Sequence, residues 1–165
     1  MFSKLLKSFG LRARGMVLPS PLAGDVIPLS EVNDGTFAAG LLGEGVALHP
    51  TGGRVIAPAD GKVEAIFPTG HAVALHTDDG FDVLIHVGLE TCKLEGRHFK
   101  VHASAGDRVG MGDLLIEFDR EAIEAEGYDL TVPVLIRNAA EFASIKGSVG
   151  EHVAELDQLI IAKGR

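Results

Sequence analysis

The segment from Thr69 to Gly88 reads TGHAVALHTDDGFDVLIHVG, and it is the most informative stretch of the chain. Two short apolar runs lie on either side of Asp-Asp-Gly, which is a turn signal between strand-like segments. The segment therefore predicts an antiparallel β-hairpin. Three histidines lie on it, so the register of the hairpin matters for function.

The length of the hairpin loop determines which histidines meet. With a two-residue loop, His71 and His86 lie on the same face, directly opposite or one diagonal step apart, and His76 points to the other face. A three-residue loop would separate the pair, and we take the two-residue loop as the expectation. The expected neighbours on the shared face are Val73, Leu75 and Leu84, with Thr69 in phase.

Two imidazole rings among apolar side chains favour the neutral form, because burial disfavours the charged imidazolium. A neutral ring nitrogen is a nucleophile for a phosphoryl group, and a second ring can donate a hydrogen bond to the phosphoryl oxygens. The hydroxyl of Thr69 is placed to fix the tautomer of a ring. The same pair also suits a metal ion, and the spacing does not separate phosphoryl chemistry from a metal site.

The rest of the chain reads as many brief strands. The chain has 21 glycines, recurrent turn signals and short apolar stretches. Its apolar residues do not recur with the period of long amphipathic helices. We expect an all-β fold, namely an antiparallel β-sandwich or flattened barrel of short strands with small helical turns. The clearest helix is Glu121 to Glu126, capped by Asp119 before it and Gly127 after it. The expected strands are Gly24 to Leu29, Gly45 to Leu48, Arg54 to Ala57, Gly61 to Phe67, His71 to His76, Phe81 to Val87, Phe99 to His102, Leu114 to Phe118, Thr131 to Ile136 and Leu159 to Ala162.

The composition fits a globular protein with a single core. The chain has 165 residues, of which 46% are hydrophobic and 23% charged, and this excludes a disordered chain and a disulfide scaffold. The net charge of -8 disfavours nucleic-acid binding, because a phosphate backbone requires a basic surface. The single cysteine, Cys92, cannot form an internal disulfide, so a reducing, cytoplasmic location is expected.

Residues 1–14 form a basic arm before the expected single domain of residues 15–165. Apolar residues at positions 2, 5, 6 and 9 have the spacing of one helix face, and the arm carries four basic residues and no acidic one. Residues 2–14 therefore predict weak contact with an anionic membrane surface, which would place the protein at the inner face of the membrane.

The segment from Gly80 to Thr91 reads GFDVLIHVGLET. Together with Gly70-His71-Ala72 upstream, it resembles the glucose-family enzyme IIA of the bacterial phosphoenolpyruvate:sugar phosphotransferase system. The resemblance covers nearly the whole body and implies an antiparallel β-sandwich, in agreement with the strand pattern. Other segments resemble the family in the expected order, namely Pro21 to Gly24, Val46 to Pro50, Ala57 to Gly61, Ala105 to Val109 and Gly112 to Asp119.

The resemblance implies a role for each residue of the pair. His86 would accept the phosphoryl group on Nε2, His71 would support the transfer, and Thr69 would orient His71. The donor would be the histidine-containing phosphocarrier protein, with the phosphoryl group derived from phosphoenolpyruvate. The recipient would be a cysteine of an enzyme IIB domain that feeds a sugar permease. No cofactor is required for this chemistry.

Transfer between proteins requires an exposed, shallow site with an apolar rim and a few charges. By family position, the rim and its acidic groups are Phe37, Leu42, Phe67, Leu84, Ile85, Asp34 and Glu90. The chain departs from the family pattern at two positions. Glu90 stands where an aspartate is usual, and Cys92 replaces an aliphatic residue, so we expect Cys92 to be a small buried or half-buried residue.

Two other functions remain open at this point. One is a regulatory binding protein whose phosphorylation state selects the permease or metabolic enzyme that it engages. The other is a zinc hydrolase built on His71 and His86, which the absence of His-x-His and His-Glu-x-x-His motifs disfavours. An adventitious or regulatory zinc ion at His71 and His86 is also compatible with the sequence.

Overall fold

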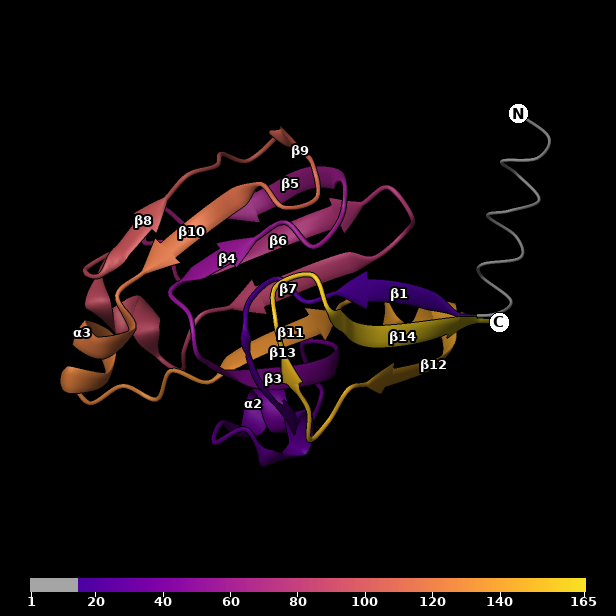
Figure 1. The fold of residues 1–165 in the computed structure, drawn as a ribbon, viewed down its shortest axis with the longest axis horizontal. Coiled ribbons are helices and arrows are strands. Elements are labelled where there is room, and N and C mark those ends of the chain that lie inside the picture. The colour runs from indigo at the N-terminus through magenta and orange to yellow at the C-terminus, as the bar shows by residue number, and fades with distance from the viewer. Residues whose placement is uncertain (1–14) are drawn as a thin grey trace.

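The computed structural model describes residues 15–165, and the predicted arm of residues 1–14 lies outside them (Figure 1). The described chain is built from 14 short strands, two short α-helices and three 3₁₀ helices. The strands are β1 (Met16–Pro19), β2 (Gly24–Pro28), β3 (Glu44–Pro50), β4 (Arg54–Ile56), β5 (Gly61–Ile66), β6 (Ala72–Thr77), β7 (Asp82–His86), β8 (Phe99–Val101), β9 (Arg108–Val109), β10 (Leu114–Phe118), β11 (Val132–Ile136), β12 (Phe142–Gly147), β13 (His152–Val153) and β14 (Gln158–Gly164). The helices are η1 (Leu29–Glu31), α2 (Gly35–Ala38), η2 (Thr91–Leu94), α3 (Arg120–Ala125) and η3 (Ala139–Glu141).

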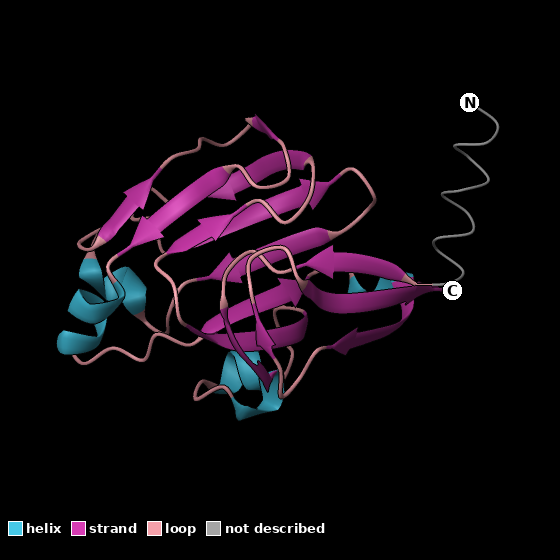
Figure 2. Ribbon diagram, viewed as in Figure 1, coloured by secondary structure: helices cyan, strands magenta, loops and turns pink. Residues whose placement is uncertain are grey.

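The strands pair antiparallel and form three sheets. The large sheet has eight strands in the order β13-β2-β3-β11-β7-β6-β5-β9, and two three-stranded sheets run β1-β14-β12 and β4-β10-β8. Figure 2 shows strands throughout the body, with short helices only at its margins. The predicted all-β antiparallel sandwich is confirmed. None of the helices in residues 15–165 has the length and apolar character to cross a bilayer.

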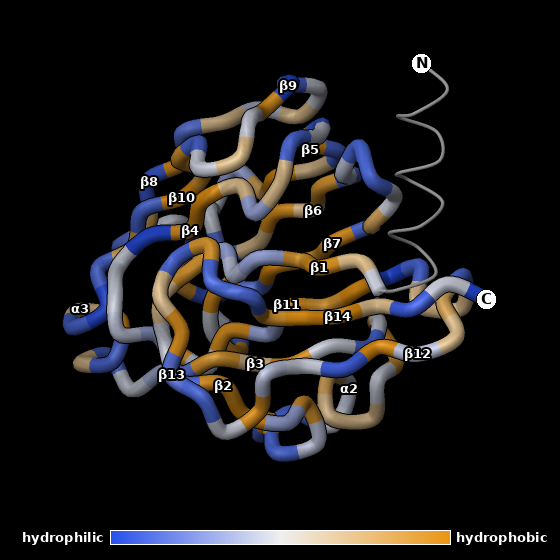
Figure 3. The backbone as a smooth tube through the Cα atoms, turned by 45° about the vertical axis from the view of Figure 1, so that its right-hand side comes forward, coloured by the Kyte–Doolittle hydropathy of each residue, from blue (hydrophilic) through white to orange (hydrophobic). Residues whose placement is uncertain are grey.

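Both small sheets share a hydrophobic core with one face of the large sheet. Val83 and Ile85 of β7 point into this core, and Leu115 of β10 and Leu159 of β14 join it from the small sheets. The apolar colouring in Figure 3 follows these strands through the body. Because a fully buried aliphatic side chain contributes about 1.5–3 kcal/mol, this core holds the three sheets together.

Intervening residues of the large sheet point to its opposite, outer face. Ala47 of β3, Leu135 of β11 and Leu84 of β7 form a second apolar cluster there with Phe37 of α2. Side chains alternate along a strand, so His86 projects from the same face of β7 as Leu84. The outer face therefore carries the candidate functional residue.

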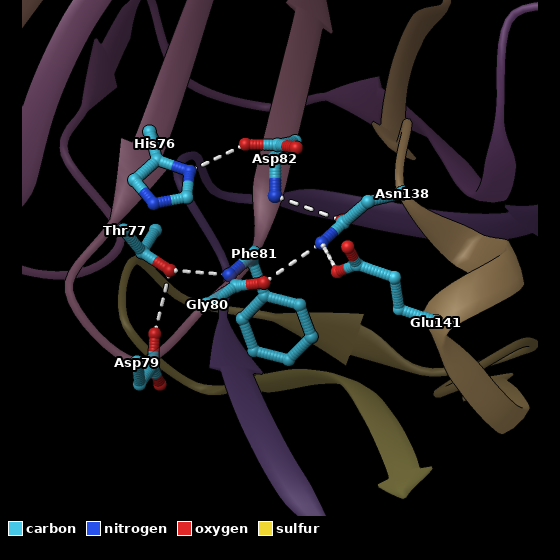
Figure 4. Close-up of polar contacts among 8 residues, drawn as sticks. All are labelled: His76, Thr77, Asp79, Gly80, Phe81, Asp82, Asn138 and Glu141. Atoms are coloured by element: carbon cyan, nitrogen blue, oxygen red, sulfur yellow. Dashed lines mark hydrogen bonds and ion pairs between the residues drawn. The ribbon is translucent and has the colours of Figure 1, made fainter. Parts of the chain in front are cut away.

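The loop of the β6–β7 hairpin has three residues, Asp78 to Gly80, and the prediction of a two-residue loop is wrong. The register pairs Ala72 with His86 directly across the two strands. The Thr77 hydroxyl fixes this turn, since it donates to Asp79 Oδ1 at 2.6 Å and accepts from the Phe81 N–H at 2.9 Å (Figure 4).

This register corrects the predicted faces. Val73 and Leu75 belong to the main core and do not share a face with His86. His76 has the same parity as Ala72, the register partner of His86, so His76 lies on the outer face with His86 and not on the other side. His71 precedes the first residue of β6, so strand alternation does not determine its direction.

The turn is also hydrogen-bonded to a side chain from a distant part of the chain. The side chain of Asn138 accepts from the Asp82 N–H at 2.9 Å and donates to the Gly80 carbonyl at 2.8 Å (Figure 4). Asn138 Nδ2 also donates to Glu141 Oε2 at 2.6 Å. These bonds tie the hairpin to the segment that follows β11.

We predict that Asn138→Ala destabilises the chain by about 1–3 kcal/mol, because it leaves one backbone donor and one backbone acceptor of the turn without partners. Urea denaturation followed by circular dichroism measures this loss. Asn33→Ala, at an exposed asparagine on another loop, is the control and should change stability by less than about 0.5 kcal/mol. Equal losses of stability in the two variants would contradict a stabilising role for the Asn138 hydrogen bonds.

Candidate functional site

The structure brings the rings of His71 and His86 together. Their centroids lie 5.2 Å apart, and the planes meet edge to face at 74°. His86 is the last residue of β7, and His71 follows Gly70, whose φ of +77° turns the chain just before β6. The carbonyl of His71 accepts from the Val87 N–H at 2.6 Å, which fixes the backbone of His71 beside that of β7.

Two phenylalanines flank the ring pair. Phe67 stacks on His71 with centroids 4.8 Å apart, and Phe37 lies against His86 with centroids 5.1 Å apart. Phe67 is 50% exposed, whereas Phe37 is only 6% exposed. The rings therefore lie in an apolar setting that still reaches the surface through Phe67.

The contact between His86 and Gly88 assigns the two nitrogens of the His86 ring. Nδ1 lies 2.6 Å from the Gly88 carbonyl oxygen, and a carbonyl can only accept, so Nδ1 carries the proton. In the neutral ring the lone pair is then on Nε2. Gly88 has a φ of +84°, and a Cβ there would lie 2.4 Å from Thr91 Cγ2, so this loop requires glycine.

Further bonds hold the loop that presents the Gly88 carbonyl. The buried Thr91 hydroxyl donates to the Val87 carbonyl at 2.5 Å, and the Leu89 N–H donates to the Asp129 carbonyl at 2.8 Å. The sequence reasoning missed Gly88, Thr91 and Asp129. A glycine two residues after the histidine was the available signal, since glycine is the residue that adopts a positive φ without strain.

Thr69 contacts His71 as the sequence suggested. Its Oγ1 lies 2.7 Å from His71 Nδ1, and a hydroxyl can donate to or accept from a ring nitrogen. His71 is 6% exposed, so this hydroxyl is the hydrogen-bond partner of a largely buried ring.

Burial favours the neutral form of both rings. It lowers the pKa of His71, and the charge that His86 would carry lowers it further. It also lowers the pKa of His86, against smaller opposing effects of the hydrogen bond to Gly88 and the charge of Asp34. Neutral rings at pH 7 are what a nucleophilic nitrogen requires.

The predicted apolar rim is only partly exposed, and Phe37 is buried against His86 and so is not part of an exposed rim. Leu42 and Phe67 are 42% and 50% exposed, and Leu84 is half-buried in the outer-face cluster. Ile85 is fully buried in the main core, so its assignment to the rim is wrong, because its place on β7 points it away from His86. Leu41, which is not among the predicted rim residues, is 75% exposed.

The predicted acidic groups differ in their surroundings. Asp34 caps α2 by accepting from the N–H groups of Thr36 and Phe37, and so it also places Phe37 against His86. Glu90 is exposed, with a φ of +56° at the start of η2. Cys92 is exposed, so the prediction of a buried or half-buried residue is wrong; it lies in the short surface helix η2.

The fold and the ring pair together define an antiparallel β-sandwich with a paired-histidine site at its surface. Residues 16–142 match the family model described as phosphoenolpyruvate-dependent sugar phosphotransferase system, EIIA 1. The chain belongs to this family, and the resemblance seen in the sequence is confirmed.

Named relatives include long and short proteins. The chain is 48% identical over 150 residues to the β-glucoside-specific EIIBCA component of Dickeya chrysanthemi, covering 89% of this chain and 24% of that protein. It is 41% identical to the glucose-specific EIIA component of Bacillus cereus, covering 91% of this chain and 90% of that protein. The solved structure of glucose permease IIA from Mycoplasma capricolum superposes with a TM-score of 0.80 at 28% identity, covering 89% of this chain and 95% of that one.

We predict that a pH titration followed by NMR gives His71 and His86 pKa values below the ordinary 6.5 and His76 a value above it, because Asp82 hydrogen-bonds His76. Below pH 6.5 these two histidines bind protons more readily in the unfolded chain than in the folded chain. The free energy of unfolding therefore falls as the pH drops below 6.5. His76 contributes with the opposite sign and loses stability as the pH rises above 6.5. Values above 6.5 for His71 and His86 would contradict their burial.

Proposed function

We propose that the chain is a phosphocarrier of a sugar phosphotransferase system, with His86 as the residue that carries the phosphoryl group. The observation that carries the proposal is the hydrogen bond from His86 Nδ1 to Gly88, which leaves the Nε2 lone pair free. The second ring, 5.2 Å away, supports it. The long relatives contain much more chain than this one, so the enzyme IIB and permease partners are part of the proposal.

The reaction consists of two phosphoryl transfers. In the first, the His86 Nε2 lone pair attacks phosphorus, and the bond from phosphorus to a histidine nitrogen of the phosphocarrier protein breaks. In the second, a cysteine thiolate of enzyme IIB attacks, and the bond from phosphorus to Nε2 breaks. The leaving ring takes the electron pair in each step, so neither step requires a cofactor or a metal ion.

His71 and Thr69 stabilise the phosphoryl group in this proposal. When the Thr69 hydroxyl donates to His71 Nδ1, the proton of the neutral His71 ring is on Nε2, and this N–H is the donor to the phosphoryl oxygens. The apolar setting of Phe37 and Phe67 strengthens that hydrogen bond by lowering the local dielectric.

The partners would dock on the exposed apolar side chains of Phe67, which stacks on His71, and of the segment that follows α2. Leu41, Leu42 and Phe67 supply the exposed area, and Asp34 and Glu90 supply negative charge for a basic partner surface. Such charges mainly speed encounter and fix orientation. Because phosphoenolpyruvate is a metabolite of the cell interior, the proposal places the chain in the cytoplasm.

The pair of His71 and His86 does not by itself supply a full set of zinc ligands. Zinc sites usually have at least three protein ligands, and within residues 15–165 no carboxylate or thiol lies close enough to His71 and His86 to share an ion with them. An ion held there would need ligands from another molecule, and it would occupy the nitrogen that accepts the phosphoryl group.

We also propose a second function, regulation of other proteins, in which a partner would dock on the surface beside His86. Phosphorylation would add about two negative charges to that surface. A partner that docks there would therefore distinguish the two states. Binding of such a partner to His86→Ala, which stays unphosphorylated, would separate this role from phosphoryl transfer.

We predict that His86→Ala abolishes phosphoryl acceptance, because it removes the nucleophilic nitrogen. His71→Ala should be phosphorylated but should pass the group to enzyme IIB more slowly, by about 10²-fold or more, the usual cost of one transition-state donor. The assay incubates the full chain with phosphoenolpyruvate, enzyme I and the phosphocarrier protein, and measures acid-labile, base-stable phosphate.

His102→Ala is the matched control, because its ring pairs with Glu117 and with neither Thr69 nor the ring pair in the described residues, and it should be phosphorylated like the wild type. Circular dichroism verifies that each variant is folded. Label that persists in folded His86→Ala would overturn the assignment of the acceptor.

We also predict that Glu90→Gln slows phosphorylation by the phosphocarrier protein several-fold at low salt, because one steering charge is lost from the docking surface. Among residues 15–165, the exposed carboxylate of Glu90 makes only a surface ion pair with Lys93, so the fold should be unaffected. The difference should shrink as the salt concentration rises, since exposed charges are screened within about 8 Å at physiological ionic strength. A defect that salt does not reduce would argue against steering.

A further inference from the structure

The outer face of the large sheet carries a second group of chemically active side chains, at the turn end of the β6–β7 hairpin. Glu64 of β5, His76 of β6 and Asp82 of β7 each offer one ligand atom, and these atoms all lie within 4.8 Å of one another. We propose that these three side chains form a binding site for a divalent transition-metal ion such as Zn²⁺. This metal trio is separate from the pair of His71 and His86.

The backbone holds the metal trio in place, because the ligands come from three adjacent strands of one sheet. His76 and Asp82 are direct register partners, and Nδ1 of His76 lies 2.5 Å from Oδ1 of Asp82 (Figure 4). Glu64 lies at a β-bulge, where the pairing of β5 with β6 shifts between Val63 and Ala65. A bulge redirects a side chain, and here the redirected carboxylate meets its two partners.

The ligand set selects the class of ion. One imidazole nitrogen and two carboxylate oxygens suit zinc and related transition metals, with open positions for water. Calcium and magnesium prefer sets made of oxygen only, with six or more ligands. The two carboxylates balance the charge of a divalent ion. The hydrogen bond to Asp82 raises the pKa of His76, and the negative charge of Asp78 raises it further. His76 binds as the neutral ring, so a proton that it shares with Asp82 is released to solvent.

A bound ion would cross-link the strands that lead to the paired rings. Asp82 and His86 are the two ends of β7, separated by roughly 13 Å at 3.3 Å per residue. Leu84 lies between them on the same face. The metal trio is therefore too far from His86 for one ion to contact both sites, and its effect would be on the rigidity of β5, β6 and β7.

Titration of Zn²⁺ into the full chain by calorimetry, with NMR to locate the bound ion, tests the proposal. We expect wild-type protein to bind one ion at the metal trio, with shifted signals for the His76 ring. Glu64→Gln and His76→Gln should each weaken this binding by at least about tenfold. Glu64→Gln is the cleaner variant, because its carboxylate makes none of the hydrogen bonds that fix this hairpin.

Two controls make the result specific. His102→Gln removes an imidazole that pairs with a single carboxylate, Glu117, and should leave the affinity unchanged. His71→Gln should leave binding at the metal trio intact. The proposal is overturned if the wild type binds no Zn²⁺, if affinity survives in His76→Gln and Glu64→Gln, or if His71→Gln is the variant that loses it.

Discussion

The hydrogen bond from His86 Nδ1 to the Gly88 carbonyl is the contact on which the candidate site depends. It places the ring proton on one nitrogen and leaves the other with its lone pair. The bond requires the Gly88 carbonyl to face the ring, and this requires a backbone with a φ of +84° that a Cβ would bring into collision with Thr91. Burial then keeps the ring neutral, so the nitrogen is both free and nucleophilic. The hydrogen bond to Gly88 determines which nitrogen of His86 carries the lone pair, and burial keeps that nitrogen unprotonated.

The two faces of the large sheet have different roles in this geometry. Residues of β7 that point inward, Val83 and Ile85, anchor the strand in the main core. Residues that point outward, Leu84 and His86, face the smaller apolar cluster around Phe37. One strand thus combines a rigid inner side with a partly exposed outer side. The two transfers that we propose between protein partners would need this combination, because a deep cleft would exclude the partners and a mobile loop would not hold the ring.

Much of the fold could be predicted from the sequence, because local signals carry it. The turn residues and apolar runs gave the antiparallel sandwich, and α3 begins after its predicted cap, Asp119, which accepts from the Ala122 N–H. Four strands were missed, namely β1, β9, β12 and β13. β1 pairs with β14 at the other end of the chain, β9 and β13 have only two residues each, and only Phe142 of β12 is buried. The hairpin register was missed because Asn138, 56 residues from Asp82, helps to set the turn. The ring contact nevertheless exists because His71 lies before β6, where Gly70 turns the chain. The residues of the ring pair were therefore identified by their chemistry and by family resemblance, while the predicted geometry behind them was incorrect.

Measurement of the tautomer of His86 in the unphosphorylated chain tests most directly whether Nε2 is free to accept a phosphoryl group. Long-range proton–nitrogen correlation NMR at neutral pH distinguishes a protonated ring nitrogen from one that carries a lone pair. We expect a neutral His86 ring with its proton on Nδ1 and an unprotonated Nε2. A ring protonated on Nε2, or a charged ring at that pH, would contradict it.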